Sequence, residues 1–361
     1  YGRGCIHNCS YCYAKAELVV HGYWNNPVPV PVDINRIRKA FYITFETDKE
    51  HKFRPILEKR IPLRIGSMSD SFMWTDRTYK VTQELLKILK FYEYPYVVFT
   101  RSDLIAEDEY MELIDPRLAA IQVSISSVDE NISKLLEPGA PSPTRRLMAL
   151  RKLAESGYWT TVRLNPLFPM YPDGYFTDAS FKWKGEVPKL DISSFEMVDV
   201  IADYKVPAII AGFGRFSRLS LNAVEKALGI NFRQFFRRDK VCKSTRDYHY
   251  SDEEIRYYYN EIKNRCDLRG VQFTTCYIGN GEEHFWRDQD IWCNKIDCCN
   301  IKGRVESFKG IDCRQIPFET RVRYSNRKCS EPISNRIHEH LGMEIGKVGT
   351  KQCERVPEVD L

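Results

Sequence analysis

Between residues 60 and 212, short runs of β-branched and aromatic residues alternate with longer stretches that have the apolar spacing of amphipathic helices. Strand and helix alternating in this way is typical of parallel βα units with right-handed crossovers. The expected strands are residues 63–66, 96–100, 120–124, 160–165 and 208–212, and the expected helices are residues 76–92, 103–115, 143–156 and 193–203.

A further strand just ahead of Cys5 would bring the number of units to about six, fewer than the eight of a closed barrel. The pattern therefore predicts an α/β fold, an open partial (βα)6 barrel over residues 1–215. Beyond it come a basic aromatic segment, a helix at about 252–266, a strand at 271–276 and an irregular region. We place the boundary between 215 and 245, and expect residues 216–361 to form a C-terminal substrate or auxiliary region.

Composition supports a folded protein without a membrane partner. The 361 residues are 43% apolar, enough for a real core, yet no apolar run is long enough to cross a bilayer and no signal peptide is visible. The net charge of +5 is unevenly spread, with Arg and Lys concentrated in 232–243 and 302–328. Such clusters suit a phosphate-bearing partner, and a solvated basic face is the alternative.

The distribution of the twelve cysteines points to metal chemistry. Three lie within eight residues at the start, none lies between Cys12 and Cys242, and nine follow. A disulfide framework would be spaced more evenly, so we expect a reducing, cytoplasmic compartment. Cys5, Cys9 and Cys12 have the spacing C-x3-C-x2-C, which lets three thiolates converge on one centre. Structural zinc would need a fourth ligand, whereas a [4Fe–4S] cluster with three cysteines keeps one iron open; unligated thiols are the remaining alternative.

With Tyr11 before its last cysteine, this loop resembles that of the radical S-adenosylmethionine (SAM) superfamily. The resemblance implies a radical SAM barrel with a [4Fe–4S] cluster on Cys5, Cys9 and Cys12, SAM on the open iron and Tyr11 against the adenine. It also implies an electron donor such as flavodoxin or ferredoxin. Reduction of the cluster would then cleave SAM to a 5′-deoxyadenosyl radical, which abstracts a hydrogen atom from the substrate.

Polar side chains at the ends of the expected strands are candidates for the SAM pocket. Ser67 and Ser69 stand where the superfamily has a segment that accepts the SAM amine. Arg101 and Ser124 are suited to the SAM carboxylate, and Asn165 to the ribose hydroxyls. Each of them could instead be a structural polar group, and no residue is assigned to the hydrogen transfer.

The stretch from Thr100 to Leu147 resembles the spore photoproduct lyase-like branch of the superfamily, which is associated with DNA photoproduct repair. The matching segments are Thr100-Arg101-Ser102, 123–127 (VSISS) and 136–147 (LEPGAPSPTRRL). Arg101 replaces the lysine usual in that branch. The hydrogen-donating cysteine of the lyase has no counterpart between Cys12 and Cys242, so the branch does not define the reaction.

The last third of the chain suggests a second cofactor and a substrate. Candidate ligands of an auxiliary Fe–S cluster are Cys276, Cys293, Cys298, Cys299 and Cys313; structural zinc or plain thiols are the alternatives. Aromatic side chains such as Trp286 and Trp292 interleave with basic ones, a pattern suited to stacking bases and neutralising phosphates. Core aromatics with a charged surface would look the same.

Three functions therefore compete. The first is a radical SAM enzyme that abstracts hydrogen from a nucleobase in DNA or RNA, or from a nucleotide, for modification or repair. The second is a radical SAM enzyme that acts on a peptide or small metabolite, with an auxiliary Fe–S cluster. The third, a non-catalytic Fe–S protein, is disfavoured because it would keep a cluster loop and a SAM pocket without using them.

Overall fold

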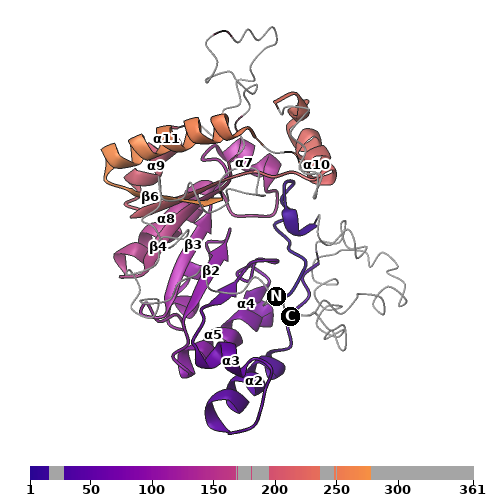
Figure 1. The fold of residues 1–361 in the computed structure, drawn as a ribbon, viewed down its shortest axis with the longest axis vertical. Helices are drawn as coiled ribbons and strands as arrows, with labels where there is room; N and C mark the ends of the chain where they lie inside the picture. Colours follow the sequence, from indigo (N-terminus) through magenta and orange to yellow (C-terminus); the bar gives the residue numbers. More distant parts are fainter. Residues whose placement is uncertain are drawn as a thin grey trace, which may run out of the picture.

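The computed structural model describes residues 1–15, 28–167, 169, 180, 195–235, 248 and 250–277. Within them the chain forms a parallel β-sheet with helices packed along one side (Figure 1). The α/β alternation predicted between residues 63 and 212 is confirmed. None of the helices in these segments is both long and apolar enough to cross a membrane.

The sheet has six strands, whose order in space is their order in the chain. Every neighbouring pair is parallel. All the carboxyl ends therefore lie at one edge, the edge at which βα folds bind ligands. The strands are β1 (Leu63–Ile65), β2 (Tyr96–Thr100), β3 (Ala119–Ser124), β4 (Trp159–Leu167), β5 (Ala208–Phe213) and β6 (Gln272–Tyr277).

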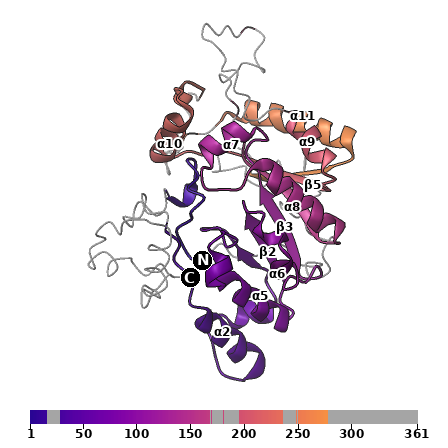
Figure 2. The same cartoon turned by 180° about the vertical axis from the view of Figure 1, so that it is seen from behind.

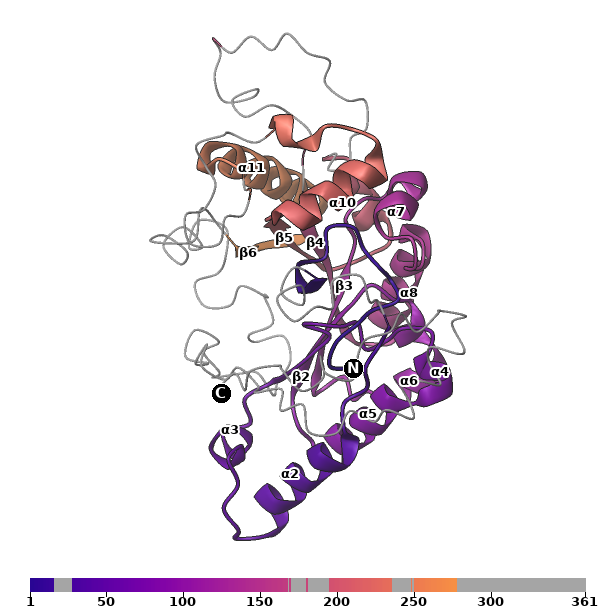
Figure 3. The ribbon, with the colours of Figure 1, turned by 90° about the vertical axis from the view of Figure 1, so that its right-hand side faces the viewer.

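Helices connect successive strands, and α8, α6 and α5 are lined up along one side of the sheet (Figures 2 and 3). Local chemistry sets where they begin: the Ser142 hydroxyl caps α8 by accepting from the Arg145 N–H, and Pro143 occupies the first turn. The helices are α2 (Ile34–Glu46), α3 (Arg54–Glu58), α4 (Asp76–Tyr79), α5 (Val81–Phe91), α6 (Asp108–Met111), α7 (Glu130–Leu136), α8 (Pro143–Glu155), α9 (Met197–Asp203), α10 (Arg218–Leu228) and α11 (Asp252–Arg269).

The two faces of the sheet differ in chemistry. Val98 pairs in register with Ile121, and these residues belong to the main hydrophobic core. The intervening residues point the other way: Phe99 pairs with Gln122, and Gln122 pairs with Thr161. We call the face that carries Phe99, Gln122 and Thr161 the inner face. A parallel sheet covered on both sides is usually apolar on both, so polar residues here indicate a site.

The sixth strand does not lie where the sequence pattern placed it. Residues 1–4 contain only an isolated antiparallel bridge, from Arg3 to Val30, in place of the strand expected ahead of Cys5. The sixth strand is β6, which follows α11 and pairs with β5. The sheet therefore continues past residue 215, because the apolar run at 271–276 completes its hydrogen bonds along the β5 edge.

Two expected helices are also divided. Residues 76–92 form α4 and α5, because Lys80 adopts a left-handed conformation with φ 53° and turns the chain. The Asp76 carboxylate stabilises the break by accepting the Thr82 N–H at 2.9 Å. Residues 103–115 contain a single 3-10 turn (Leu104–Ala106) followed by the short α6.

Candidate active site at the carboxyl edge of the sheet

The segment with Cys5, Cys9 and Cys12 is a pair of tight turns. The Asn8 N–H donates to the Cys5 carbonyl and the Cys12 N–H to the Cys9 carbonyl, both at 3.3 Å. Asn8 has a φ of 50°, in the left-handed region that Asn tolerates better than most residues. The turns gather the three cysteines into one compact loop, which runs past α7 (Figures 1 and 2).

Two thiols of this loop have raised pKa values, so a bound cation would be needed to stabilise their thiolate forms. Burial raises the pKa of Cys5 to about 12, against the opposing effect of backbone N–H groups of Asp70 and His7. Burial also raises the pKa of Cys9, and negative charge on Cys12 or Cys5 raises it further. The thiols are therefore close enough to repel one another as thiolates. In the described part of the chain, no three His, Cys, Asp or Glu side chains are grouped closely enough to hold a metal ion as they stand.

His7 ties the cysteine loop to β1. Its Nε2 lies 3.1 Å from the Asp70 carboxylate, and its Nδ1 lies 3.1 Å from the Gly139 carbonyl oxygen. Since a carbonyl only accepts, Nδ1 donates. Asp70 also accepts from the Thr100 hydroxyl and from two backbone N–H groups, those of Arg101 and Phe72. Burial opposes charge on Asp70, but His7 and these donors lower its pKa.

The turn after α7 holds the other side of the loop. The Ser10 N–H donates to the Leu136 carbonyl at 2.8 Å, and the Gly139 N–H donates to the His7 carbonyl at 3.1 Å. A β-carbon on Gly139 would lie 2.0 Å from the Ile6 carbonyl oxygen. The turn and the loop are therefore in backbone contact, which only glycine at 139 allows.

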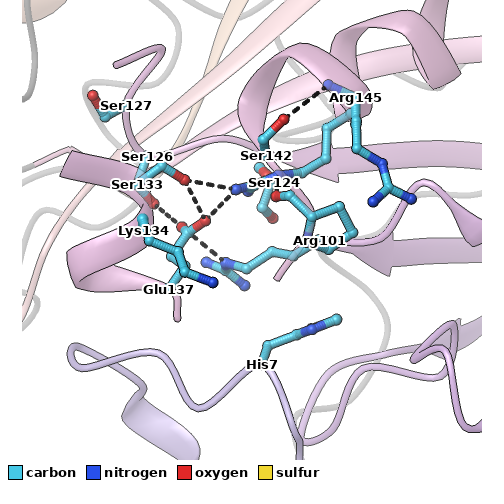
Figure 4. A network of polar contacts seen from close by, with 12 residues as sticks. His7, Arg101, Ser124, Ser126, Ser127, Ser133, Lys134, Glu137, Ser142 and Arg145 are labelled. Atoms are coloured by element: carbon cyan, nitrogen blue, oxygen red, sulfur yellow. Dashed lines mark hydrogen bonds and ion pairs between the residues drawn. The ribbon is translucent and has the colours of Figure 1, made fainter. Parts of the chain in front are cut away.

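Glu137 is the centre of a buried polar network (Figure 4). Its side chain is 1% exposed, and the fully buried Arg146 guanidinium donates to it. The Ser126 hydroxyl donates to it at 2.9 Å, and the Tyr11 hydroxyl donates to it as well. Burial opposes its ionisation, but the charges of Arg146 and then Arg101 outweigh burial and lower its pKa to about 2.

Arg101 connects this network to the loop and to β4. Its Nε donates to the Tyr11 hydroxyl at 3.1 Å, and its Nη2 donates to the Asn165 carbonyl at 3.0 Å. Its guanidinium lies 5.3 Å from the centroid of the Tyr11 ring and forms a 3.5 Å ion pair with Glu137. Since 25% of its side chain remains exposed, Arg101 can still bind an anion at the mouth of the barrel.

The other predicted SAM-site residues surround the same loop, in different environments. The Ser69 hydroxyl is buried and donates to the Gly4 carbonyl. Ser67 is exposed, and its carbonyl accepts from Tyr13. Ser124 is buried, and its carbonyl accepts from Arg146 at 2.8 Å. The structure thus brings Tyr11, Arg101 and the Asn165 carbonyl together, whereas Ser69 contacts the chain ahead of Cys5 and Ser67 is exposed.

Sequence reasoning missed the residues that hold the loop. Asp70 and Glu137 lie in segments that were singled out, but without a role for either carboxylate. His7 sits between two cysteines, the strongest available signal that it serves the loop. Arg146 is one of two adjacent arginines, and only the structure distinguishes it, buried, from Arg145, which pairs with Asp103 at the surface.

Of the candidate ligands of an auxiliary cluster, only one lies in the described part of the chain. Cys276 lies on β6, and Cys293, Cys298, Cys299 and Cys313 lie outside the described residues, as do Trp286 and Trp292. In the basic stretch that begins at Phe232, the described Arg233 forms an ion pair with Glu225 at 3.2 Å.

Fold and loop together define a class of protein: a partial βα barrel with a three-cysteine loop at the carboxyl edge of its sheet. Residues 1–179 match the sequence model of the Radical SAM superfamily, and this part of the chain belongs to that superfamily. The expected family and fold class are thereby confirmed.

Similar proteins extend over different shares of the chain. An uncharacterised protein of Methanocaldococcus jannaschii is 28% identical over 171 residues, which are 46% of this chain and 58% of that protein. An uncharacterised protein of Acidianus two-tailed virus is 24% identical over 283 residues, 74% of this chain and 79% of the other. An uncharacterised Mycobacterium tuberculosis protein is 22% identical over 173 residues, covering 47% of this chain and 49% of that protein. The chain therefore spans about half the length of the archaeal and mycobacterial relatives.

Among solved structures, spore photoproduct lyase has a similar fold. A variant with bound AdoMet and a dinucleoside spore photoproduct has a TM-score of 0.52 at 16% identity, over 76% of this chain and 74% of that one. A second, with the dinucleoside photoproduct, has a TM-score of 0.50 at 17% identity, over 75% and 73%. At such identities the likeness concerns the fold.

Proposed function

We propose that this protein is a radical SAM enzyme that abstracts a hydrogen atom from a nucleobase or nucleotide. The observation that carries the proposal is the double attachment of the cysteine loop to the carboxyl edge of the sheet, through His7–Asp70 and Tyr11–Glu137. A loop without a cofactor would not require two anchors on buried carboxylates, since each buried charge is costly unless it is compensated.

Cys5, Cys9 and Cys12 would hold a [4Fe–4S] cluster. The pKa values of Cys5 and Cys9 are raised by burial and by negative charge on neighbouring thiolates, so these thiols become stable thiolates when a cationic cluster compensates their charge. Backbone N–H groups of His7 and Asp70 at the Cys5 sulfur would stabilise that thiolate further.

The surrounding residues would bind SAM. Arg101 would attract the carboxylate, since its guanidinium is partly exposed and already oriented by Tyr11 and Asn165. Ser69 and Ser124 would contribute hydroxyls at the same edge, Asn165 would reach the ribose, and Tyr11 would lie against the adenine. When bound, the cluster and SAM supply a 5′-deoxyadenosyl radical, for which a flavodoxin or ferredoxin would provide the electron.

A nucleobase or nucleotide substrate is supported by the chemistry of the inner face and by the fold. Arg64 and Arg163 lie over the Phe99 ring on that face, a combination that suits a planar anion. The lyases of similar fold were solved with a dinucleoside photoproduct. We propose residues 216–361 as the part that completes the substrate site, beyond the strand that they add to the sheet.

Anaerobic reconstitution tests the proposal. We expect about four irons per chain with SAM cleaved to 5′-deoxyadenosine after reduction, and neither of these in Cys9→Ala. Cys266→Ala is the matched control, because Cys266 is also a buried thiol but lies on α11 and not in the cysteine loop. Iron retained in a Cys5/Cys9/Cys12→Ala triple variant would show a second cluster. A cluster without any SAM cleavage would instead favour the non-catalytic alternative.

A further inference from the structure

Two polar atoms on the inner face are buried without a partner. Phe99, Gln122 and Thr161 form a straight row across β2, β3 and β4. Gln122 and Thr161 are both 0% exposed. Across the described residues, neither the Gln122 Nε2 nor the Thr161 Oγ1 has a hydrogen-bond partner. A buried donor left unpaired is destabilising, so these atoms require a group that the described chain does not supply.

Chemistry settles which way Gln122 faces. The Arg163 Nη1 donates to the Gln122 Oε1 at 3.1 Å, and a guanidinium has only donors to offer. The Nε2 is therefore the amide atom left over. Since Thr161 is the register partner of Gln122, the row presents a fixed donor beside a hydroxyl that can accept. An acceptor beside an N–H, as on the edge of a nucleobase, satisfies both.

An aromatic ring and positive charge adjoin these atoms. Phe99 is the register partner of Gln122 on the other side, and it is partly exposed. The guanidinium carbon of Arg163 lies 5.3 Å from the centroid of the Phe99 ring, and that of Arg64 lies 5.9 Å from it. Arg64 is exposed, and it takes part in none of the ion pairs found among the described residues.

We propose that the inner-face row of Phe99, Gln122 and Thr161, with Arg64 at its open side, is a substrate subsite for a nucleobase carrying a phosphate. Gln122 and Thr161 would read the base edge, Phe99 would stack on the base, and Arg64 would bind the phosphate. The inference rests on the proposed function, narrows its substrate to a nucleobase that carries a phosphate, and adds the residues that recognise it. It places the base on the inner face, two positions along the strands from the Ser124–Arg163 pair and toward their amino ends.

Calorimetric titration of the reconstituted, SAM-bound protein tests the subsite. The probes are the four deoxynucleoside 5′-monophosphates and their uncharged nucleosides. For the monophosphate that binds, we expect Arg64→Gln to weaken affinity about five- to tenfold, down to that of the nucleoside, with nucleoside affinity unchanged. Arg117 is an exposed arginine just before β3, at the opposite end of that strand from Ser124. Arg117→Gln is the control and should change neither affinity.

Gln122→Met tests whether Gln122 binds the edge of the base, because it removes the amide with little change in side-chain volume. We expect it to abolish binding of monophosphate and nucleoside alike while the melting temperature of the free protein holds or rises, because an unpaired donor has been removed. Gln83→Met is the control, since Gln83 is a buried glutamine that donates to Glu109; it should lower the melting temperature and leave binding intact.

The outcomes separate the two proposals. Unchanged affinity in both Arg64→Gln and Gln122→Met would mean that the orphan atoms hold water, and would overturn the subsite. Failure of all four monophosphates to bind, in protein that still cleaves SAM, would overturn it too while leaving the radical SAM proposal standing. If the reconstituted wild-type protein does not cleave SAM, the result would count against the proposed function itself.

Discussion

Gly139 and Ile6 approach so closely that a β-carbon at position 139 would lie 2.0 Å from the Ile6 carbonyl oxygen. These residues are far apart in sequence: Gly139 lies in the turn after α7, and Ile6 lies in the cysteine loop. Their contact joins the LEPGAPSPTRRL segment to the proposed cluster site, and thereby gives that segment a physical role: it is the support on which the loop rests.

Gly139→Ala should therefore reduce cluster content. The added methyl must push the loop away from the turn, at a cost of about 1–3 kcal/mol, which displaces Cys5 and Cys9 from their positions. Iron per chain after reconstitution is the measurement. Gly157→Ala is the control: its φ of 86° strains the backbone, but nothing lies within 4 Å of the new methyl, so stability falls while iron content holds.

Glu137 should make the protein sensitive to acid. Its pKa falls from an ordinary 4.5 to about 2 on folding, through Arg146 and Arg101 acting against burial. A depressed carboxyl pKa contributes stability that is present above about pH 4.5 and is lost as pH falls toward 2. Urea unfolding as a function of pH should show this loss, and a flat profile below pH 4.5 would refute it.

Replacing the Glu137 carboxylate should destabilise the protein even at neutral pH. Glu137→Gln leaves the Arg146 guanidinium buried without its anion, which costs about 3–5 kcal/mol. Combining it with Arg146→Met should recover part of the loss, because the unpaired charge disappears as well. If the unfolding free energy lost in the double variant equals the sum of the losses in Glu137→Gln and Arg146→Met alone, the two residues are not coupled.

Arg101→Ala should weaken SAM binding more than it alters cluster content. Loss of a charge-assisted hydrogen bond is worth about 1.5–3 kcal/mol, or roughly a 10- to 100-fold rise in the Kd for SAM. Arg101→Lys should weaken SAM binding less, because lysine keeps the positive charge but lacks the bidentate donor geometry of a guanidinium. Arg145→Ala, which removes an exposed arginine paired with Asp103, should leave the Kd unchanged. If Arg101→Ala binds SAM like the wild type, Arg101 does not belong to the site.

Removal of iron should lower the melting temperature. A cluster that binds only the folded loop stabilises the native state, so chelation under anaerobic conditions should reduce Tm by about 4 °C or more. Cys9→Ala should show no such response, since it carries no cluster to lose. A chelator effect of equal size in Cys9→Ala would place the iron elsewhere in the chain.

The sequence by itself determined the alternation of strands and helices, the class of fold and the cysteine loop. These depend on local properties: the period of apolar residues, turn chemistry and the spacing of three thiols within one short segment. It also allowed the prediction that Arg101 and Asn165 lie near each other, because the carboxyl ends of parallel strands share an edge. Helix α8 was predictable for the same local reason, with Ser142 and Pro143 marking its start.

Only the tertiary structure decided what holds the loop and which strand completes the sheet. His7 and Asp70 are 63 positions apart, and Tyr11 and Glu137 are 126 apart, so no local pattern could pair them. The run at 271–276 was recognisable as a strand, but its place beside β5 depends on hydrogen bonds between distant segments. Likewise Gln122 becomes an unpaired donor only where neighbouring strands bury it, because burial is a property of the packed sheet and not of the residue.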